Sequence, residues 1–184
     1  MGRARLDAEA VTAAAAAIAD SEGLETVTLS AVAARLGVKP PSLYAHVAGL
    51  PDLRRRLARR AADGLSQALS EALAGRAAGD ALRAAGHTYR EWALRHPGQH
   101  AALQLVQLDD DPAPGRVVDL LVSVLRGYAL EGDAAIHAVR AMRAAFHGFV
   151  TLEAAGGFRI PLATDASFEW LLRLLDRGLS GQLR

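Results

Sequence analysis

Cysteine is absent from this chain of 184 residues, and so is any apolar run near the ~20 residues that span a bilayer. The first absence excludes disulfides and thiolate metal sites. The second, together with the acidic residues Asp7 and Glu9 near the start, predicts neither a membrane anchor nor a signal peptide. We therefore expect a cytoplasmic protein that has no membrane partner.

Recognisable catalytic motifs are missing as well. The sequence has no Gly-x-Ser-x-Gly elbow, no phosphate-binding glycine loop and no His-Glu-x-x-His zinc motif. His96 and His100 are separated by a proline, and His137 and His147 are expected on offset faces of one helix. The acidic run at 109–111 lies beside prolines, where such runs are usually solvated loops. We expect no enzyme, no metal site and no cofactor.

Strand signals are also scarce, because glycine and proline stand between segments of helical periodicity. We predict an all-α protein of about nine helices. The helix at 133–155 is expected to be the longest, and Asp80 is expected to cap another. Apart from the helix at 133–155, the predicted helices of the body cover 53–73, 80–96 (the one that Asp80 caps), 98–106 and 117–128. A last helix is expected to begin at Asp165 or Ser167.

Charge is small overall but unevenly distributed. The formal net charge is +1, yet residues 1–60 hold nine Lys/Arg and six Asp/Glu, while residues 61–184 hold twelve and fourteen. A basic head on an acidic body suits a polyanionic partner for the head alone. A merely solvated surface is the alternative.

Residues 28–47 (TLSAVAARLGVKPPSLYAHV) are predicted to form two short helices joined by a tight turn. Thr28 can cap the first helix through its hydroxyl, and Gly37 stands where that helix should end. Pro40 and Pro41 can begin a helix but cannot lie inside one. The apolar spacing predicts one buried face for each helix, made of Leu29, Val32, Ala33 and Leu36 in the first and of Leu43 and Val47 in the second.

Four polar side chains are left for the opposite surface: Lys39, Ser42, Tyr44 and His46. A cation, a hydroxyl, a phenol and an imidazole suit phosphate oxygens and base edges of DNA. An ordinary helical hairpin is the alternative, since such hairpins are common. A preceding Ala-rich helix at 7–22 favours the DNA-binding interpretation, because three helices make a module that can bury a core.

From about Leu6 to Leu57 the chain resembles the N-terminal domain of the TetR family of bacterial transcriptional regulators. The resemblance rests on Gly23, Thr28, Val32-Ala33, Gly37-Val38 and, above all, Leu43-Tyr44-x-His46-Val47. It implies a homodimeric repressor that binds double-stranded DNA at an inverted-repeat operator and leaves it when a small-molecule effector binds. The chain departs from the family at Lys39, Pro41 and Leu50, where the family often has a small capping residue, a glycine and a phosphate-binding lysine.

The head is expected to comprise residues 1–52, and a ligand-binding and dimerisation domain residues 53–184. In the head, the second short helix should enter the major groove. Ser42 and His46 are expected to contact bases, and Arg3 and Arg5 to reach the minor groove. Phosphate contacts are expected from Thr28, Lys39, Tyr44 and Arg54.

The body resembles, more loosely, the subgroup of the family named for a Trp-His-Gly (WHG) motif. Here Phe146-His147-Gly148 carries phenylalanine in place of the tryptophan. The resemblance implies a ligand domain, whereas aromatic residues at helical spacing are also how helices pack into a plain core. The expected effector pocket is lined by Tyr89, Trp92, His100, Leu103, Phe146 and His147.

The last helix carries a broad apolar stripe that Trp170 and Leu174 widen. We expect a dimer interface there, because the stripe exceeds what one core face needs and two-fold pairing is common. The alternative is that this helix is central to one core. A helical small-molecule-binding or interaction protein without DNA readout is the alternative for the whole chain. The predicted interface residues are Phe168, Leu171, Leu172, Leu175 and Leu179.

Overall fold

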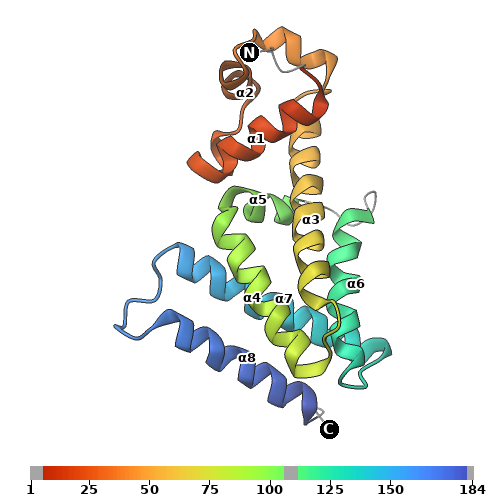
Figure 1. Ribbon diagram of the computed structural model, residues 1–184. Coiled ribbons are helices and arrows are strands. Elements are labelled where there is room, and N and C mark those ends of the chain that lie inside the picture. The colour runs from red at the N-terminus through yellow and green to blue at the C-terminus, as the bar shows by residue number, and fades with distance from the viewer. Residues whose placement is uncertain (1–5, 106–111, 182–184) are drawn as a thin grey trace. The chain divides into compact units, whose positions relative to one another are not determined.

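The computed structural model describes residues 6–105 and 112–181 (Figure 1). Within those ranges it has eight α-helices, three short 3-10 helices and no strand, which confirms the all-α prediction. In chain order they are α1 (Ala8–Glu22), η1 (Leu24–Thr26), α2 (Leu29–Leu36), η2 (Pro40–Ala45), α3 (Leu50–Leu73), α4 (Ala78–Arg95), α5 (Pro97–Ala102), η3 (Leu103–Leu105), α6 (Pro112–Arg126), α7 (Gly132–Ala154) and α8 (Thr164–Ser180).

The chain forms two compact units. The first is made of Met1–Gly64 and Arg95–Pro114, and the second of Leu65–Leu94 and Gly115–Arg184. Helix α3 contributes its first half to the first unit and its second half to the second. Helix α5, which follows α4 in the chain, packs with the N-terminal helices.

The N-terminal helices begin and end at the capping and stop residues that the sequence predicts. The Asp7 carboxylate accepts a hydrogen bond of 2.8 Å from the Ala10 N–H at the start of α1. The Thr28 hydroxyl accepts one of 3.1 Å from the Ala31 N–H at the start of α2. Gly37 then ends α2 in the left-handed region, with φ 67° and ψ 31°, where a Cβ would add strain.

Some predicted helix limits in the body are wrong. Helix α3, with 24 residues, is longer than α7, with 23, because α3 begins at Leu50 instead of 53. Helix α4 begins at Ala78, so Asp80 lies in its first turn and does not cap it. There the carboxylate still favours the helix, since the N-terminal end carries partial positive charge.

The core of the first unit is formed by α1, α2, η2 and the start of α3. Val11, Val32, Leu43 and Leu53 are fully buried in it. Burial of a leucine or valine side chain contributes about 1.5–3 kcal/mol, so these few contacts hold the short helices in place. The predicted apolar faces of residues 28–47 therefore point inward.

The second unit has a core that is richer in aromatic rings. Phe146 of α7 and Phe168 of α8 are fully buried, with ring centroids 6.3 Å apart. Gly86 of α4 allows close approach, because a Cβ there would lie 2.5 Å from Leu172 of α8. Helices α4, α7 and α8 thus pack around one another.

Candidate nucleic-acid interface

The predicted DNA-reading helix is a 3-10 helix, η2, instead of an α-helix. Two consecutive prolines stand at its start, and the ring of Pro41 disfavours the α conformation at Pro40. Its hydrogen bonds are short-range: the Ser42 N–H donates to the Lys39 carbonyl (2.9 Å), and the His46 N–H donates to the Leu43 carbonyl (2.8 Å). Leu43 and Val47 are buried and anchor the segment, as their spacing predicted.

The polar side chains of η2 lie at the surface. Tyr44 is 62% exposed although it is aromatic, and Lys39 and Ser42 are exposed as well. His46 is half-buried. A large ring left in solvent beside a cation and a hydroxyl is the kind of surface that contacts phosphates and bases. The structure places these four predicted residues on one short segment of the first unit.

The residues predicted to contact phosphates differ in whether their polar atoms are available to bind DNA. Thr28 uses one lone pair to cap α2, and its O–H remains available to donate. Arg54, on the first turns of α3, is half-buried, and its Nε is a buried atom without a hydrogen-bond partner in the described part of the chain. Arg3 and Arg5 lie outside the described residues.

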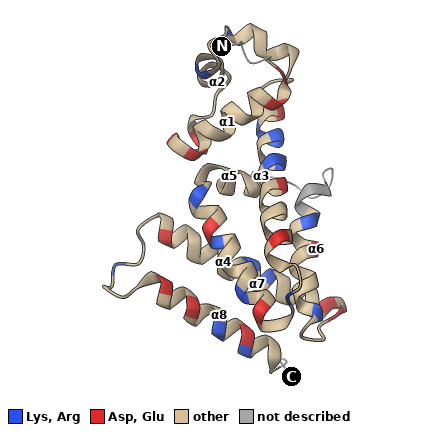
Figure 2. Ribbon diagram, in the orientation of Figure 1, with Lys and Arg blue, Asp and Glu red and all other residues tan. Residues whose placement is uncertain are grey.

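The other arginines of the basic run on α3, seen in blue in Figure 2, mostly bind carboxylates. Arg55 and Arg56 both contact Asp52, at 3.3 and 3.0 Å. Arg60 contacts Glu9 of α1. The pKa of Asp52 lies below its usual 3.8, mainly because its carboxylate accepts a hydrogen bond from the Ala48 N–H and then because Arg56 donates to it. Asp52 therefore fixes both the start of α3 and two cations.

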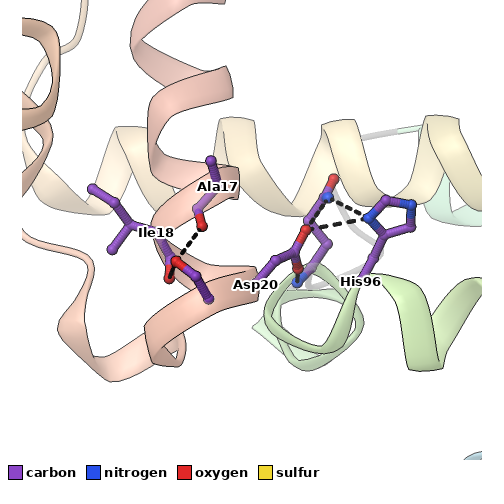
Figure 3. Close-up of polar contacts among 6 residues, drawn as sticks. Ala17, Ile18, Asp20 and His96 are labelled. Carbon is purple, nitrogen blue, oxygen red and sulfur yellow. Dashed lines mark hydrogen bonds and ion pairs between the residues drawn. The ribbon is translucent and has the colours of Figure 1, made fainter.

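A polar cluster that was not predicted from the sequence joins α1 to α5 (Figure 3). The Asp20 carboxylate accepts hydrogen bonds from the Gln99 backbone N–H (2.9 Å) and from its side-chain amide (2.7 Å). The His96 imidazole lies 3.2 Å from the same carboxylate. A Cβ at Gly98 would overlap the backbone of Ala19. Helix α5 is thus held against α1 both by polar contacts and by close packing.

No sequence signal of short range marks that cluster. Asp20 and Gln99 are 79 residues apart. From the sequence, His96 is only a possible metal ligand and the end of a predicted helix. The structure gives it a carboxylate partner instead. Among the described residues, no group of three or more His, Cys, Asp or Glu side chains is placed to hold a metal ion.

The predicted effector residues divide between the two units. Tyr89, Trp92, Phe146 and His147 belong to the second unit. His100 and Leu103, which belong to the first, complete the predicted set.

Three of these residues are buried in the core of the second unit, and His147 is half-buried. Tyr89 and Trp92 are each only 5% exposed, and the Tyr89 and Phe146 rings lie 5.8 Å apart. Burial raises the pKa of Tyr89 to about 12 and, with Arg143 as a second cause, lowers that of His147 below 6.5. The neutral forms of both side chains are therefore favoured at neutral pH, which suits an apolar site.

An arginine of α4 joins the ends of α7 and α8. The Arg90 guanidinium donates to both oxygens of Glu153 (2.7 and 2.5 Å) and to Asp165 (2.7 Å). It also lies over the Phe168 ring, 5.0 Å from the centroid. These hydrogen bonds raise the pKa of Arg90, so it stays charged. Helix α8 is thereby held at its first turn.

Two of the five predicted dimer residues belong to the chain's own core. Phe168 and Leu172 are fully buried against α4 and α7, so their side chains are not available to a partner. The half-buried members of the predicted set are Leu171, Leu175 and Leu179. The most exposed apolar side chains of α8 are Trp170 (61%) and Leu174 (51%), which the sequence analysis treated only as widening the stripe.

Helices α1 and α2 and the segment η2 form a small module, whose last element presents polar side chains to solvent, and the chain continues into a helical domain. This arrangement is typical of a helix-turn-helix DNA-binding protein. Residues 11–46 match the family model described as bacterial regulatory proteins, tetR family. Residues 82–175 match the model described as the C-terminal domain of tetracyclin repressor-like proteins. The chain belongs to the TetR family of transcriptional regulators. In the described ranges, no helix is long and apolar enough to cross a membrane.

Two relatives that are similar over most of their length are also named as transcriptional regulators. The chain is 38% identical over 181 residues to an uncharacterized HTH-type transcriptional regulator of Mycobacterium tuberculosis, Rv0681, covering 96% of this chain and 83% of that protein. It is 35% identical over 181 residues to the uncharacterized regulator YobS of Bacillus subtilis, covering 96% and 94%. Both relatives are named as HTH-type transcriptional regulators.

Solved structures show the same fold. The transcriptional regulator SCO7222, a TetR from Streptomyces coelicolor, superposes with a TM-score of 0.76 at 20% identity, covering 97% of this chain and 100% of that one. A TetR variant from Acinetobacter baumannii AYE, in complex with minocycline, gives 0.75 at 22% identity, covering 96% and 98%. At such identities the likeness establishes the fold alone.

Proposed function

We propose that this protein is a cytoplasmic repressor that binds an inverted-repeat operator as a homodimer and leaves DNA when a small molecule binds. The observation that carries the proposal is the surface of η2, where Tyr44 is exposed beside Lys39 and Ser42 while Leu43 anchors the segment beneath them. A solvated hairpin has no need of an exposed aromatic ring at that position.

The roles of the η2 side chains follow from their chemistry and exposure. Ser42 and His46 offer a hydroxyl and an imidazole for base edges, and the Tyr44 phenol suits a phosphate. Arg54, a half-buried arginine on the first turns of α3 just after η2, offers a guanidinium for a further phosphate contact. Such a contact takes the place of the lysine that Leu50 replaces.

The test is binding to DNA from upstream of the protein's own coding region, measured by fluorescence anisotropy at several salt concentrations. Tyr44→Phe should weaken binding about tenfold without changing sequence preference, since one hydrogen bond to a charged phosphate is lost. His46→Ala should alter preference at one base pair, by about 1–3 kcal/mol. Tyr89→Phe is the matched control, because Tyr89 is buried in the second unit, and it should bind DNA like wild type.

Normal operator binding by the Tyr44→Phe/His46→Ala double variant would show that η2 does not read DNA. Binding to all DNA equally, or to none, would instead favour the alternative of a helical binding protein without DNA readout. Circular dichroism of each variant separates a lost contact from a lost fold.

The effector proposal rests on the aromatic core of the second unit. Tyr89, Trp92 and Phe146 give a ligand apolar surface, while the neutral phenol and the neutral imidazole of His147 give it polar partners. The minocycline complex of the A. baumannii TetR variant supports the idea that this fold accommodates a ring compound.

The chain's two tryptophans allow a matched test of the effector site, since Trp92 is buried and Trp170 is exposed. A panel of small hydrophobic compounds is screened for release of operator DNA. A compound that releases DNA should change the fluorescence of the Trp170→Phe variant, in which Trp92 alone emits. The Trp92→Phe variant should respond much less. A releasing compound that leaves Trp92 emission unchanged would place the effector elsewhere.

The link from effector to DNA is proposed to run through α5. Helix α4 ends at Arg95 and is followed directly by His96, which contacts Asp20 of α1. A displacement of the end of α4 would therefore reach α1 through the Asp20 cluster and Gly98. An effector acts in this way only if it binds one placement of the head more tightly than another.

A further inference from the structure

The second unit contains a cleft that the proposed function does not use. Its volume is about 640 Å³, and it lies where the start of α4, the α6–α7 turn and the last turns of α8 meet. None of the six residues predicted for the effector site lines it. The lining comprises Ala77, Ala78, Gly79, Asp80, Arg83, Arg126, Gly127, Tyr128, Ala129, Asp176 and Ser180.

The walls of the cleft are held in place by specific contacts. The Tyr128 hydroxyl donates a hydrogen bond of 2.5 Å to the Asp176 carboxylate, which joins the α6–α7 turn to α8. Burial and this carboxylate both raise the pKa of Tyr128, so the hydroxyl keeps its proton. At Gly127 a Cβ would overlap the backbone of Ala78, so the turn and the start of α4 are in close contact.

Backbone strain concentrates on the same cleft. In residues 6–105 and 112–181, Ala78 (φ 45°) and Ala129 (φ 55°) are the only residues other than glycine with positive φ, and both line it. Such conformations are strained for alanine and persist where the surroundings impose them, often at ligand sites.

The cleft presents charges of both signs. Arg83 binds Asp80, while Arg126 has no ion-pair partner among the residues described. A guanidinium in this position is suited to a carboxylate, which it binds with two parallel hydrogen bonds. The free oxygens of Asp80 and Asp176 are acceptors for an ammonium group. Apart from Tyr128, the lining offers no large apolar side chain.

We propose that this cleft is a second small-molecule site, which takes a zwitterion of the amino-acid class. The ligand carboxylate binds Arg126, and its ammonium group lies toward Asp80 and Asp176. A simple anion is disfavoured by the two carboxylates, and a simple cation by the two arginines. The site is independent of DNA binding and of the effector site in the aromatic core.

The test uses the full chain and the proteinogenic L-amino acids as probes, with thermal shift for screening and calorimetry for affinity. At least one amino acid should bind saturably in the millimolar range or tighter, whereas acetate and methylammonium, each alone, should bind more weakly. Arg126→Gln should weaken binding roughly tenfold or more, since one charge-assisted pair is lost. The matched control is Arg140→Gln, an exposed arginine of α7 outside the cleft, which should bind like wild type.

Three results would overturn the proposal. They are no binding by any amino acid, equal binding by Arg126→Gln, and acetate binding as tightly as the best amino acid. Operator binding is measured on the same samples. Its presence or absence tests the proposed function and leaves the outcome for the cleft unaffected.

Discussion

At the scale of single residues, small side chains decide where this protein's helices meet. Gly98 at the start of α5 faces the backbone of Ala19, and Gly86 of α4 faces Leu172. Neither position needs an unusual φ, so the requirement is for space and not for flexibility. Residues that look like helix breakers in the sequence are therefore contact points in the fold.

Replacing Gly98 by alanine should destabilise the protein, because the added methyl group would overlap Ala19. Overpacking of this kind costs about 1–3 kcal/mol, and here the obstacle is backbone, which yields little. Gly148→Ala is the matched control: its Cβ would meet nothing within 4 Å, and Ala favours the interior of α7. The control should raise stability by about 0.5–1 kcal/mol. Urea unfolding of both variants checks the opposite signs.

Residue-level prediction from the sequence succeeded where a residue's own chemistry decides the structure. The caps at Asp7 and Thr28 and the stop at Gly37 are local events, and the structure confirms them. The Asp20–Gln99 contact depends on two distant segments meeting, so nothing near either residue signals it. The burial of Phe168 in the chain's own core was likewise decided by packing against α4 and α7, which a one-helix pattern does not contain.

At the scale of elements, the starts of helices carry much of the organisation. Asp52 stands in the first turn of α3, binds the Ala48 N–H at 3.0 Å and holds Arg55 and Arg56. The carboxylate also lies near the positive end of the helix dipole. The η2 segment lies just before this turn, so Asp52 supports its position.

Asp52 should make the free energy of unfolding depend on pH in the acid range. Its pKa is lower in the folded protein than the ordinary 3.8. Its contribution to stability is therefore complete above 3.8, and it is lost as the pH falls from 3.8 through the folded value. Asp52→Asn should lower stability at neutral pH by about 1 kcal/mol and should flatten the acid dependence below 3.8.

The control for Asp52 is Asp119→Asn, an exposed carboxylate of α6. That variant should unfold in urea like wild type at neutral pH. An Asp52→Asn variant that matched wild type at neutral pH and through the acid range would show that the first turn of α3 does not depend on this carboxylate.

In η2 the sequence pattern predicts correctly which residues are exposed and which are buried, but it does not predict the type of helix. The Leu-Tyr-x-His pattern located the exposed Tyr44 and the buried Leu43 correctly. It did not predict a 3-10 helix, because the four-residue spacing of Leu43 and Val47 predicts a helix but does not say how tightly a short segment is wound. That tighter geometry determines which side chains of the segment face solvent.

At the scale of the whole molecule, the second unit leaves several large apolar side chains in solvent on α8 and on the connection between α7 and α8. Exposed apolar surface of this kind marks an interaction site. The most exposed are Phe158, Ile160, Leu162, Trp170 and Leu174.

We expect Trp170 and Leu174 to lie in the dimer interface. Replacing both by glutamate should yield a monomer and weaken operator binding by roughly two orders of magnitude or more, because two linked heads bind far better than one. Leu94→Glu, at an exposed leucine of α4, is the control and should remain dimeric. Sedimentation at micromolar concentration distinguishes them. Equal masses for the double variant and the control would move the interface away from α8.

The measurement that tests the central claim most directly is a hydroxyl-radical footprint of the wild-type protein on the DNA upstream of its own coding region. A homodimer whose two η2 segments enter successive major grooves should protect two segments about 34–36 Å apart, one turn of DNA, related by two-fold sequence symmetry. Tyr44→Phe should require a higher protein concentration for the same pattern. A single protected segment, or protection no stronger than on unrelated DNA, would contradict the account.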